Sequence, residues 1–109
     1  QGMIKKLVTL AALAMLLGSP SSYADFFPGN KLVELCDESN IYNDGVCAGY
    51  VIGISDRING EVACIPDGVT SGQAVSIVKK YLKKNPEELH YTAHSLVAFA
   101  LIKAFPCNN

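Results

Sequence analysis

The sequence lacks the motifs that catalysis or nucleotide binding would require. It contains no glycine-rich phosphate loop and no Gly-x-Ser-x-Gly turn around a nucleophilic serine. Its paired carboxylates, Asp37-Glu38 and Glu87-Glu88, are adjacent in sequence, so they would not face each other on a helix. The four cysteines are an even number and can all pair, which also argues against a free thiolate nucleophile. We therefore predict no catalytic site and do not expect an enzyme.

Histidine is scarce, and its two positions suggest only a weak metal site. His90 and His94 are four residues apart, a spacing that can place two imidazoles on one helix face for zinc. Tyr91 stands where the catalytic form of this motif has a glutamate. Glu87 is a candidate third ligand, but no fourth ligand remains once the cysteines pair. We therefore expect two polar residues at the start of a helix, with no metal and no cofactor.

Tryptophan is absent, and positive charge is not in excess. Residues 25–109 carry seven basic and ten acidic side chains, a net charge of −3. Nucleic-acid binding requires clustered positive charge, so no nucleic-acid partner is expected. A chain of this length fits one domain, and a core this small without tryptophan needs additional stabilisation.

The N-terminal segment has the three parts of a secretory signal peptide. Lys5 and Lys6 supply positive charge, Leu7 to Leu17 form an apolar stretch, and Ser22-Tyr23-Ala24 supplies the small residues of a cleavage site. The apolar stretch spans 11 residues, well short of the ~20 that a membrane-spanning helix needs. We therefore predict cleavage near Ala24 and no stable membrane insertion.

The predicted signal peptide divides the chain into two parts. Residues 1–24 are the signal peptide, with Gln1-Gly2 ahead of Met3 as an upstream remnant. Residues 25–109 are a single exported domain. Export places the cysteines in an oxidising compartment, where small domains commonly carry disulfides.

Apolar residues at helical spacing predict an all-α fold, a small disulfide-stapled bundle of four to five helices. The predicted helices are Asn30 to about Asp37, about Val46 to Ile58, Thr70 to about Lys84, and Ala93 to Ala104, with a short turn at Pro86-Glu87-Glu88. Asn30, Thr70 and Thr92 are the predicted N-caps, and Thr70 with Gln73 forms a capping box. Asn43-Asp44-Gly45 is a strong turn signal, so residues 39–45 are predicted to be a polar loop.

One face of the third predicted helix is basic. Lys79, Lys80, Lys83 and Lys84 lie late in this helix, where positive charge complements the helix dipole. We interpret the cluster as a solvated face, with partner binding as the alternative.

The four cysteines allow three pairings, and the predicted helices favour one of them. A short connection makes the third and fourth predicted helices pack antiparallel. This packing brings Cys64, which precedes the third helix, beside Cys107, which follows the fourth. By the same argument Cys36, which ends the first helix, meets Cys47, which starts the second. The predicted disulfides are Cys36–Cys47 and Cys64–Cys107.

Gly49 and Gly53 leave a strip without bulky side chains on the second predicted helix. Their spacing permits close approach of another helix, and this helix is too short to make the contact in a membrane. Packing within the domain is the first interpretation, and a dimer contact is the second.

A series of short motifs covers nearly the whole exported domain. Cys47-Ala48-Gly49-Tyr50-Val51-Ile52-Gly53 lies at its centre. It is followed in order by Cys64-Ile65-Pro66, Gly68-Val69-Thr70, Tyr81-Leu82, Asn85-Pro86-Glu87 and Ala104-Phe105-Pro106-Cys107. This series resembles the Rap/Tai type of immunity protein, a family associated with bacterial type VI secretion. Asn85 stands where the family usually has a histidine.

The resemblance implies a function as well as a fold. It implies a small, exported, α-helical protein, often a homodimer, that works in the periplasm. Such a protein would bind and occlude a secreted peptidoglycan amidase effector without chemistry of its own. The alternative is a periplasmic stress protein or chaperone that binds unfolded clients through exposed apolar surface.

The segment between the last two predicted helices is the candidate contact surface for the effector. It contains Asn85, Glu87, Glu88, His90 and Tyr91, a mixture of amide, acidic and aromatic side chains that suits a binding surface. Its carboxylates would match a basic cleft. An ordinary polar turn is the alternative interpretation.

Overall fold

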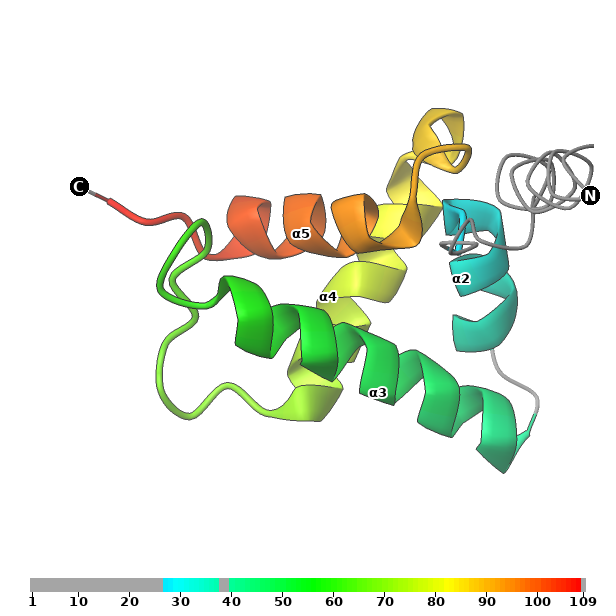
Figure 1. Cartoon of the computed structure of the whole chain (residues 1–109), viewed down its shortest axis with the longest axis horizontal. Coiled ribbons are helices and arrows are strands. Elements are labelled where there is room, and N and C mark those ends of the chain that lie inside the picture. The colour runs from blue at the N-terminus through cyan, green and yellow to red at the C-terminus, as the bar shows by residue number, and fades with distance from the viewer. Residues whose placement is uncertain (1–26, 38–39, 109) are drawn as a thin grey trace, which may run out of the picture.

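The computed structural model describes residues 27–37 and 40–108, and these form the predicted all-α fold (Figure 1). The helices are α2 (Gly29–Cys36), α3 (Ile41–Ile58), α4 (Ser71–Lys84) and α5 (Ala93–Ala104), with the short 3-10 helix η2 (Pro86–Glu88) between the last two. The described residues contain two isolated β-bridges and no strand. None of the described helices is both long enough and apolar enough to cross a membrane. The predicted signal peptide and its cleavage site lie outside the described residues.

One apolar core joins all four helices. Each helix buries the face that its apolar periodicity predicts, and α5 contributes most because it is apolar on several sides. The largest fully buried side chains are Leu32, Val51, Val78, Leu96, Val97 and Leu101. α3 packs on α2, α4 and α5, so the core lies between α3 and the other three helices.

The capping box predicted for α4 is confirmed. The Thr70 hydroxyl accepts a hydrogen bond from the Gln73 N–H at 3.1 Å, and the Gln73 amide oxygen accepts one from the Thr70 N–H at 2.7 Å. These bonds satisfy N–H groups that have no partner within the helix. The sequence therefore set the start of α4 through local chemistry alone.

The predicted start of α3 is wrong. The helix begins at Ile41 and contains Asn43-Asp44-Gly45, which we expected to form a turn. Asn40 caps it instead: its side-chain oxygen accepts a hydrogen bond from the Asn43 N–H at 2.8 Å. Asp44 then lies in the first turn, where negative charge is favourable. A capped first turn outweighs the turn propensity of the same residues.

Two of the predicted caps are also corrected. α2 starts at Gly29, so Asn30 lies inside its first turn and makes no cap. Thr92 occupies the N-cap position of α5, but its hydroxyl lies 2.8 Å from the Ser95 hydroxyl and bonds no helix N–H. The Ala93 N–H donates instead to the carbonyl of Phe27 at 2.6 Å. Backbone groups from distant segments thus replace the side-chain caps in both helices.

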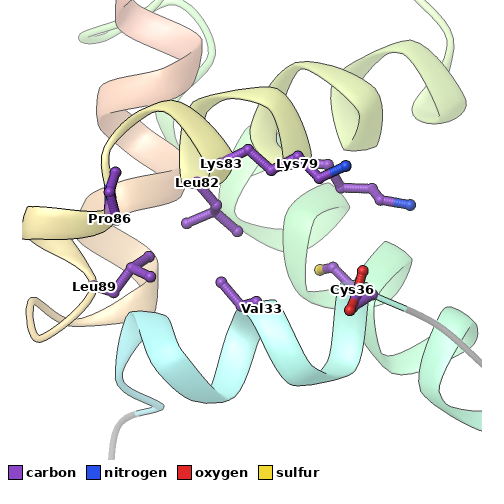
Figure 2. Close-up of a pocket in the computed structure, with 8 residues that line it drawn as sticks. Val33, Cys36, Lys79, Leu82, Lys83, Pro86 and Leu89 are labelled. Carbon is purple, nitrogen blue, oxygen red and sulfur yellow. The ribbon is translucent and has the colours of Figure 1, made fainter.

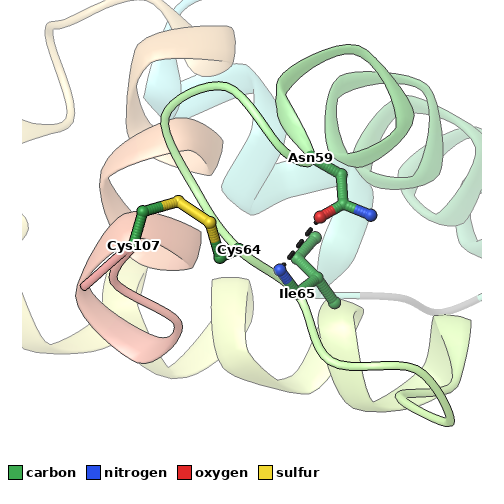
Figure 3. Close-up of a disulfide and its surroundings, with 4 residues drawn as sticks. All are labelled: Asn59, Cys64, Ile65 and Cys107. Atoms are coloured by element: carbon green, nitrogen blue, oxygen red, sulfur yellow. Dashed lines mark hydrogen bonds between the residues drawn. A yellow bond between two sulfur atoms is a disulfide. The ribbon is translucent and has the colours of Figure 1, made fainter. Parts of the chain in front are cut away.

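Both predicted disulfides are present. Cys36–Cys47 joins the end of α2 to α3 across a sequence separation of 11, and its cysteines are buried in the core. Cys64–Cys107 spans a separation of 43 and ties the chain after α5 to the loop that leads into α4 (Figure 3).

The geometry that brings Cys64 to Cys107 differs from our expectation. α5 crosses α4 instead of running alongside it (Figure 1). Cys64 is placed by the loop after α3, where its N–H donates to the Phe105 carbonyl at 2.9 Å. Next to it, the Ile65 N–H donates to the Asn59 side-chain oxygen at 2.9 Å (Figure 3). The pairing was therefore predicted correctly from a packing that is only approximately right.

Candidate partner-binding site

Residues 85–91 form a compact connection between α4 and α5, built around η2. Asn85 donates from its side-chain amide to the Tyr81 carbonyl at 2.8 Å, and the Glu88 N–H donates to the Asn85 carbonyl at 3.0 Å. The Tyr91 N–H then donates to the Glu88 carbonyl at 2.9 Å. Pro86 lies at the start of η2, where its fixed φ angle suits the turn. The segment is therefore held by its own hydrogen bonds.

The same segment is fastened to the N-terminus of α2. The Gly29 N–H donates to the Tyr91 carbonyl at 2.8 Å, and the Asn30 N–H donates to the Leu89 carbonyl at 2.9 Å. These two N–H groups belong to the first turn of α2, where no intrahelical acceptor exists. A side chain at position 29 would collide with Leu96 and lie 2.8 Å from the Leu89 carbonyl oxygen, so only glycine permits this approach.

The five predicted contact residues divide into two groups. Glu87, His90 and Tyr91 are exposed, and the Tyr91 side chain packs edge-on against the His90 ring with centroids 4.5 Å apart. Asn85 and Glu88 are half-buried, and their side chains bond to Tyr81. The first three are free to meet a partner, while the other two hold the segment in shape.

Tyr81 reports on the electrostatics of this segment. Its hydroxyl donates a hydrogen bond to the Glu88 carboxylate at 2.8 Å. Burial, this hydrogen bond and the negative charges of Glu88 and Glu87 raise the pKa of Tyr81 to about 12. Each cause disfavours the tyrosinate anion. The segment is thus an anionic site next to a neutral phenol.

We expect Glu88→Gln to lower the pKa of Tyr81 from about 12 toward its ordinary value of 10.0. Because the folded-state pKa is raised, the protonated phenol stabilises the fold below pH ~10, and this contribution is lost as pH rises through about 12. Tyrosinate absorbance during alkaline titration measures the shift, and Tyr81→Phe identifies the transition. Glu34→Gln, on α2, is the matched control. An unchanged Tyr81 transition in Glu88→Gln would contradict the assignment.

An apolar groove runs beneath the segment, between α2 and the end of α4 (Figure 2). Val33, Leu82 and Leu89 point into it from three separate parts of the chain, and Lys79 and Lys83 extend along its edge. Its volume is about 230 Å³, and it is also lined by Cys36, Asp37 and Pro86. We did not predict this groove from the sequence. Its one sequence signal is Leu89, an apolar residue within an otherwise polar segment.

The two histidines do not share a helix face. His90 precedes α5, whose first residue is Ala93, while His94 lies within the first turn of that helix. Within the part of the chain that the structure describes, no three histidine, cysteine, aspartate or glutamate side chains are grouped as metal ligands would be.

Gly49 and Gly53 lie on an exposed face of α3, so our first interpretation, packing within the domain, is wrong. A Cβ atom at either position, or at Gly45, would meet no atom of residues 27–37 or 40–108 within 4 Å. The same helix carries two strongly exposed apolar side chains at its start, Ile41 (91% exposed) and Tyr42 (76% exposed). Nothing within the described residues uses the space that these glycines leave.

These features define a small, disulfide-stapled helical protein with an exposed connection between α4 and α5 and an exposed face on α3. Residues 28–107 match the model of the Rap1a immunity proteins, so the chain belongs to that family. A search of curated proteins gave no match. The resemblance stated from the motifs is thereby confirmed. Membership indicates an immunity protein that acts against a secreted effector by binding it, a role that is generally non-catalytic.

Proposed function

We propose that this protein is a periplasmic immunity protein that binds and occludes a peptidoglycan amidase effector delivered by type VI secretion. The observation that carries the proposal is the family match across residues 28–107. The signal-peptide pattern of residues 1–24, cleaved near Ala24, supports export to the periplasm. Two disulfides suit an oxidising compartment.

Glu87, His90 and Tyr91 are the proposed contact residues. They are exposed on a segment that is already ordered by hydrogen bonds to Tyr81 and to α2, so binding would lose little conformational entropy. Tyrosine is enriched among residues that dominate interface energetics. The exposed carboxylate of Glu87 complements a basic rim around a substrate cleft, and a rigid segment placed there would exclude the cell-wall substrate.

The test uses the mature, oxidised protein as bait in a periplasmic extract of its own organism, followed by mass spectrometry. We expect one dominant partner, a cell-wall amidase. Its affinity for the variant Glu87→Lys/Tyr91→Ala should fall by about 30-fold or more, as for the loss of one interface hot spot. The thermal midpoint should stay unchanged, because both side chains are exposed.

Glu34→Lys/Phe99→Ala is the matched control, with the same change of charge and an aromatic ring of similar exposure, 43% for Phe99 against 44% for Tyr91. Undiminished amidase binding by the Glu87/Tyr91 variant would remove segment 85–91 from the interface. Capture of many unrelated proteins, with suppression of their aggregation, would favour the chaperone alternative.

We further propose that the protein forms a homodimer through α3. Gly49 lies near the middle of Ile41–Ile58, so two antiparallel copies of α3 related by a two-fold axis at Gly49 would place Gly45 opposite Gly53. The absence of side chains there permits close approach, and Ile41 and Tyr42 would be covered. Glycine within a helix costs about 0.5–1 kcal/mol relative to alanine, and no contact among the described residues requires it.

Gly49→Leu should convert such a dimer to a monomer, because a leucine at the axis would separate the two helices. Sedimentation equilibrium measures the change in mass. Gly72→Leu is the matched control, since Gly72 lies on an exposed first turn of α4 with only the Thr70 hydroxyl nearby. A monomeric starting protein, or a dimer that persists in Gly49→Leu, would contradict the proposed interface.

A further inference from the structure

Positive charge is concentrated on one side of this acidic protein. Five of the seven basic residues of the exported domain lie on α4 or near the end of α5: Lys79, Lys80, Lys83, Lys84 and Lys103. The two ion pairs of the described residues, Lys31–Glu34 and Arg57–Glu61, lie elsewhere. This surface, which we call the lysine face, therefore has no anionic partner within the part of the chain that the structure describes.

The lysine side chains on α4 repel one another because of their spacing along the helix. Lys79 and Lys83 are separated by four residues, as are Lys80 and Lys84, and side chains at this spacing are neighbours on a helix surface. Only Lys83 and Lys84 lie in the last turn, where the helix dipole favours positive charge. The isolated protein thus keeps like charges together without a compensating contact, and an anionic partner would relieve this repulsion.

A second apolar groove lies beside the lysine face, between α4 and α5. Its apolar lining comes from Ile77, Ala100, Ala104 and the ring of Tyr81, and its volume is about 230 Å³. Lys80 and Lys84 from α4 and Lys103 from α5 complete its walls, and Asn85 lines it as well. No acidic residue is among the residues that line it. This α4–α5 groove therefore combines apolar surface with three cationic groups.

We infer that the lysine face and the α4–α5 groove bind an acidic polypeptide segment. An apolar side chain of that segment enters the groove, and its flanking carboxylates pair with Lys80, Lys84 and Lys103. Carboxylates four residues apart on a helix have the same spacing as Lys80 and Lys84. This site does not include the exposed side chains of segment 85–91. The inference holds whatever the identity of the effector.

Other anionic ligands fit the surface less well. The volume is below the ~300–1,000 Å³ of typical small-molecule pockets, whereas a single side chain fits. A membrane-binding helix inserts protruding apolar side chains, but here the apolar surface is recessed between lysines. Arginine, with its planar five-donor guanidinium, is the preferred residue for nucleic-acid recognition, and the lysine face has none. A polypeptide supplies both the apolar side chain and the carboxylates.

The test is a titration of the ¹⁵N-labelled mature, oxidised protein with a synthetic helical peptide that carries glutamates four residues apart around leucines. We expect saturable chemical-shift changes at Lys80, Lys84 and Lys103 below about 1 mM peptide, weakening steeply with added salt. The same peptide with glutamine for every glutamate should bind at least about tenfold more weakly.

Variants locate the site and separate it from the effector contact. Lys80→Gln/Lys84→Gln should weaken binding of the glutamate peptide by about tenfold, and Lys31→Gln, on α2, should not. Glu87→Lys/Tyr91→Ala should leave the titration unchanged. Three results would overturn the inference: equal binding of the glutamine peptide, no saturable shift up to about 1 mM, or binding only to phosphatidylglycerol vesicles, which would indicate a membrane.

Discussion

Replacing Cys64 and Cys107 together by alanine is expected to lower the free energy of unfolding by about 4 kcal/mol. The bond closes a sequence separation of 43, and in the chain-entropy model a cross-link over such a loop restricts the unfolded chain by that amount. Single domains are stable by only about 5–15 kcal/mol, so the loss is a large fraction of the total. The thermal midpoint should fall by roughly 15–30 °C. Urea unfolding followed by far-ultraviolet circular dichroism measures the change.

The control for this variant lies beside the disulfide. Asn59→Ala removes the hydrogen bond from the Ile65 N–H but leaves the cross-link intact (Figure 3). Its expected effect is about 1 kcal/mol, the usual net value of one hydrogen bond. Equal losses in the two variants would mean that local bonding of the loop, and not the cross-link, carries the stability. A loss below about 1 kcal/mol in the cysteine variant would contradict the prediction.

Gly29→Ala is expected to destabilise the protein by about 2 kcal/mol or more, although alanine is the better helix former. The new Cβ would collide with the Leu96 side chain, which is fully buried and cannot move into solvent. It would also lie 2.8 Å from the Leu89 carbonyl oxygen and 3.1 Å from the Leu89 Cα. Segment 85–91 would therefore be displaced from α2, and effector binding should weaken together with stability.

Gly72→Ala is the matched control for this substitution. It makes the same change in the first turn of a helix, but the new methyl group would meet only the Thr70 hydroxyl among the described residues, at an ordinary contact distance of 3.8 Å. We expect it to raise the free energy of unfolding by about 0.5–1 kcal/mol through helix propensity alone. The two alanine variants should thus move stability in opposite directions. Destabilisation by both, or by neither, would contradict the assigned role of Gly29.

Two surfaces of this protein bring opposite charges to its partners. Glu87 and Glu88 give the connection between α4 and α5 a negative character, and together with burial, which is the larger cause, they raise the pKa of Tyr81. Four of the five lysines of the lysine face come directly before this connection along the chain, and Lys103 comes after it. An effector with a basic rim and an acidic flank could meet both surfaces at once. The peptide titration and the Glu87/Tyr91 variant distinguish one composite interface from two independent ones.

The contact residues were predicted from composition, and the structure divides them by burial. Glu87, His90 and Tyr91 are exposed as a binding surface requires, whereas Asn85 and Glu88 turn toward Tyr81. A sequence pattern marks a polar segment, but it does not distinguish side chains that face solvent from side chains that hold the backbone. That distinction depends on Tyr81, which lies one helix turn earlier and whose orientation is set by the core.

The sequence by itself determined the helical class, the start of α4 and the cysteine pairing. These depend on apolar spacing, on the Thr70–Gln73 capping box and on the order of helices and cysteines, all of which are local or nearly so. Only the tertiary structure decided the start of α2, the exposure of the α3 glycines and the two apolar grooves. Carbonyls of residues 89 and 91 replace the expected Asn30 cap, and each groove is lined by segments distant in sequence. Periodicity identifies which face of a helix is apolar, but the partner that covers that face, or leaves it open, is set by long-range packing.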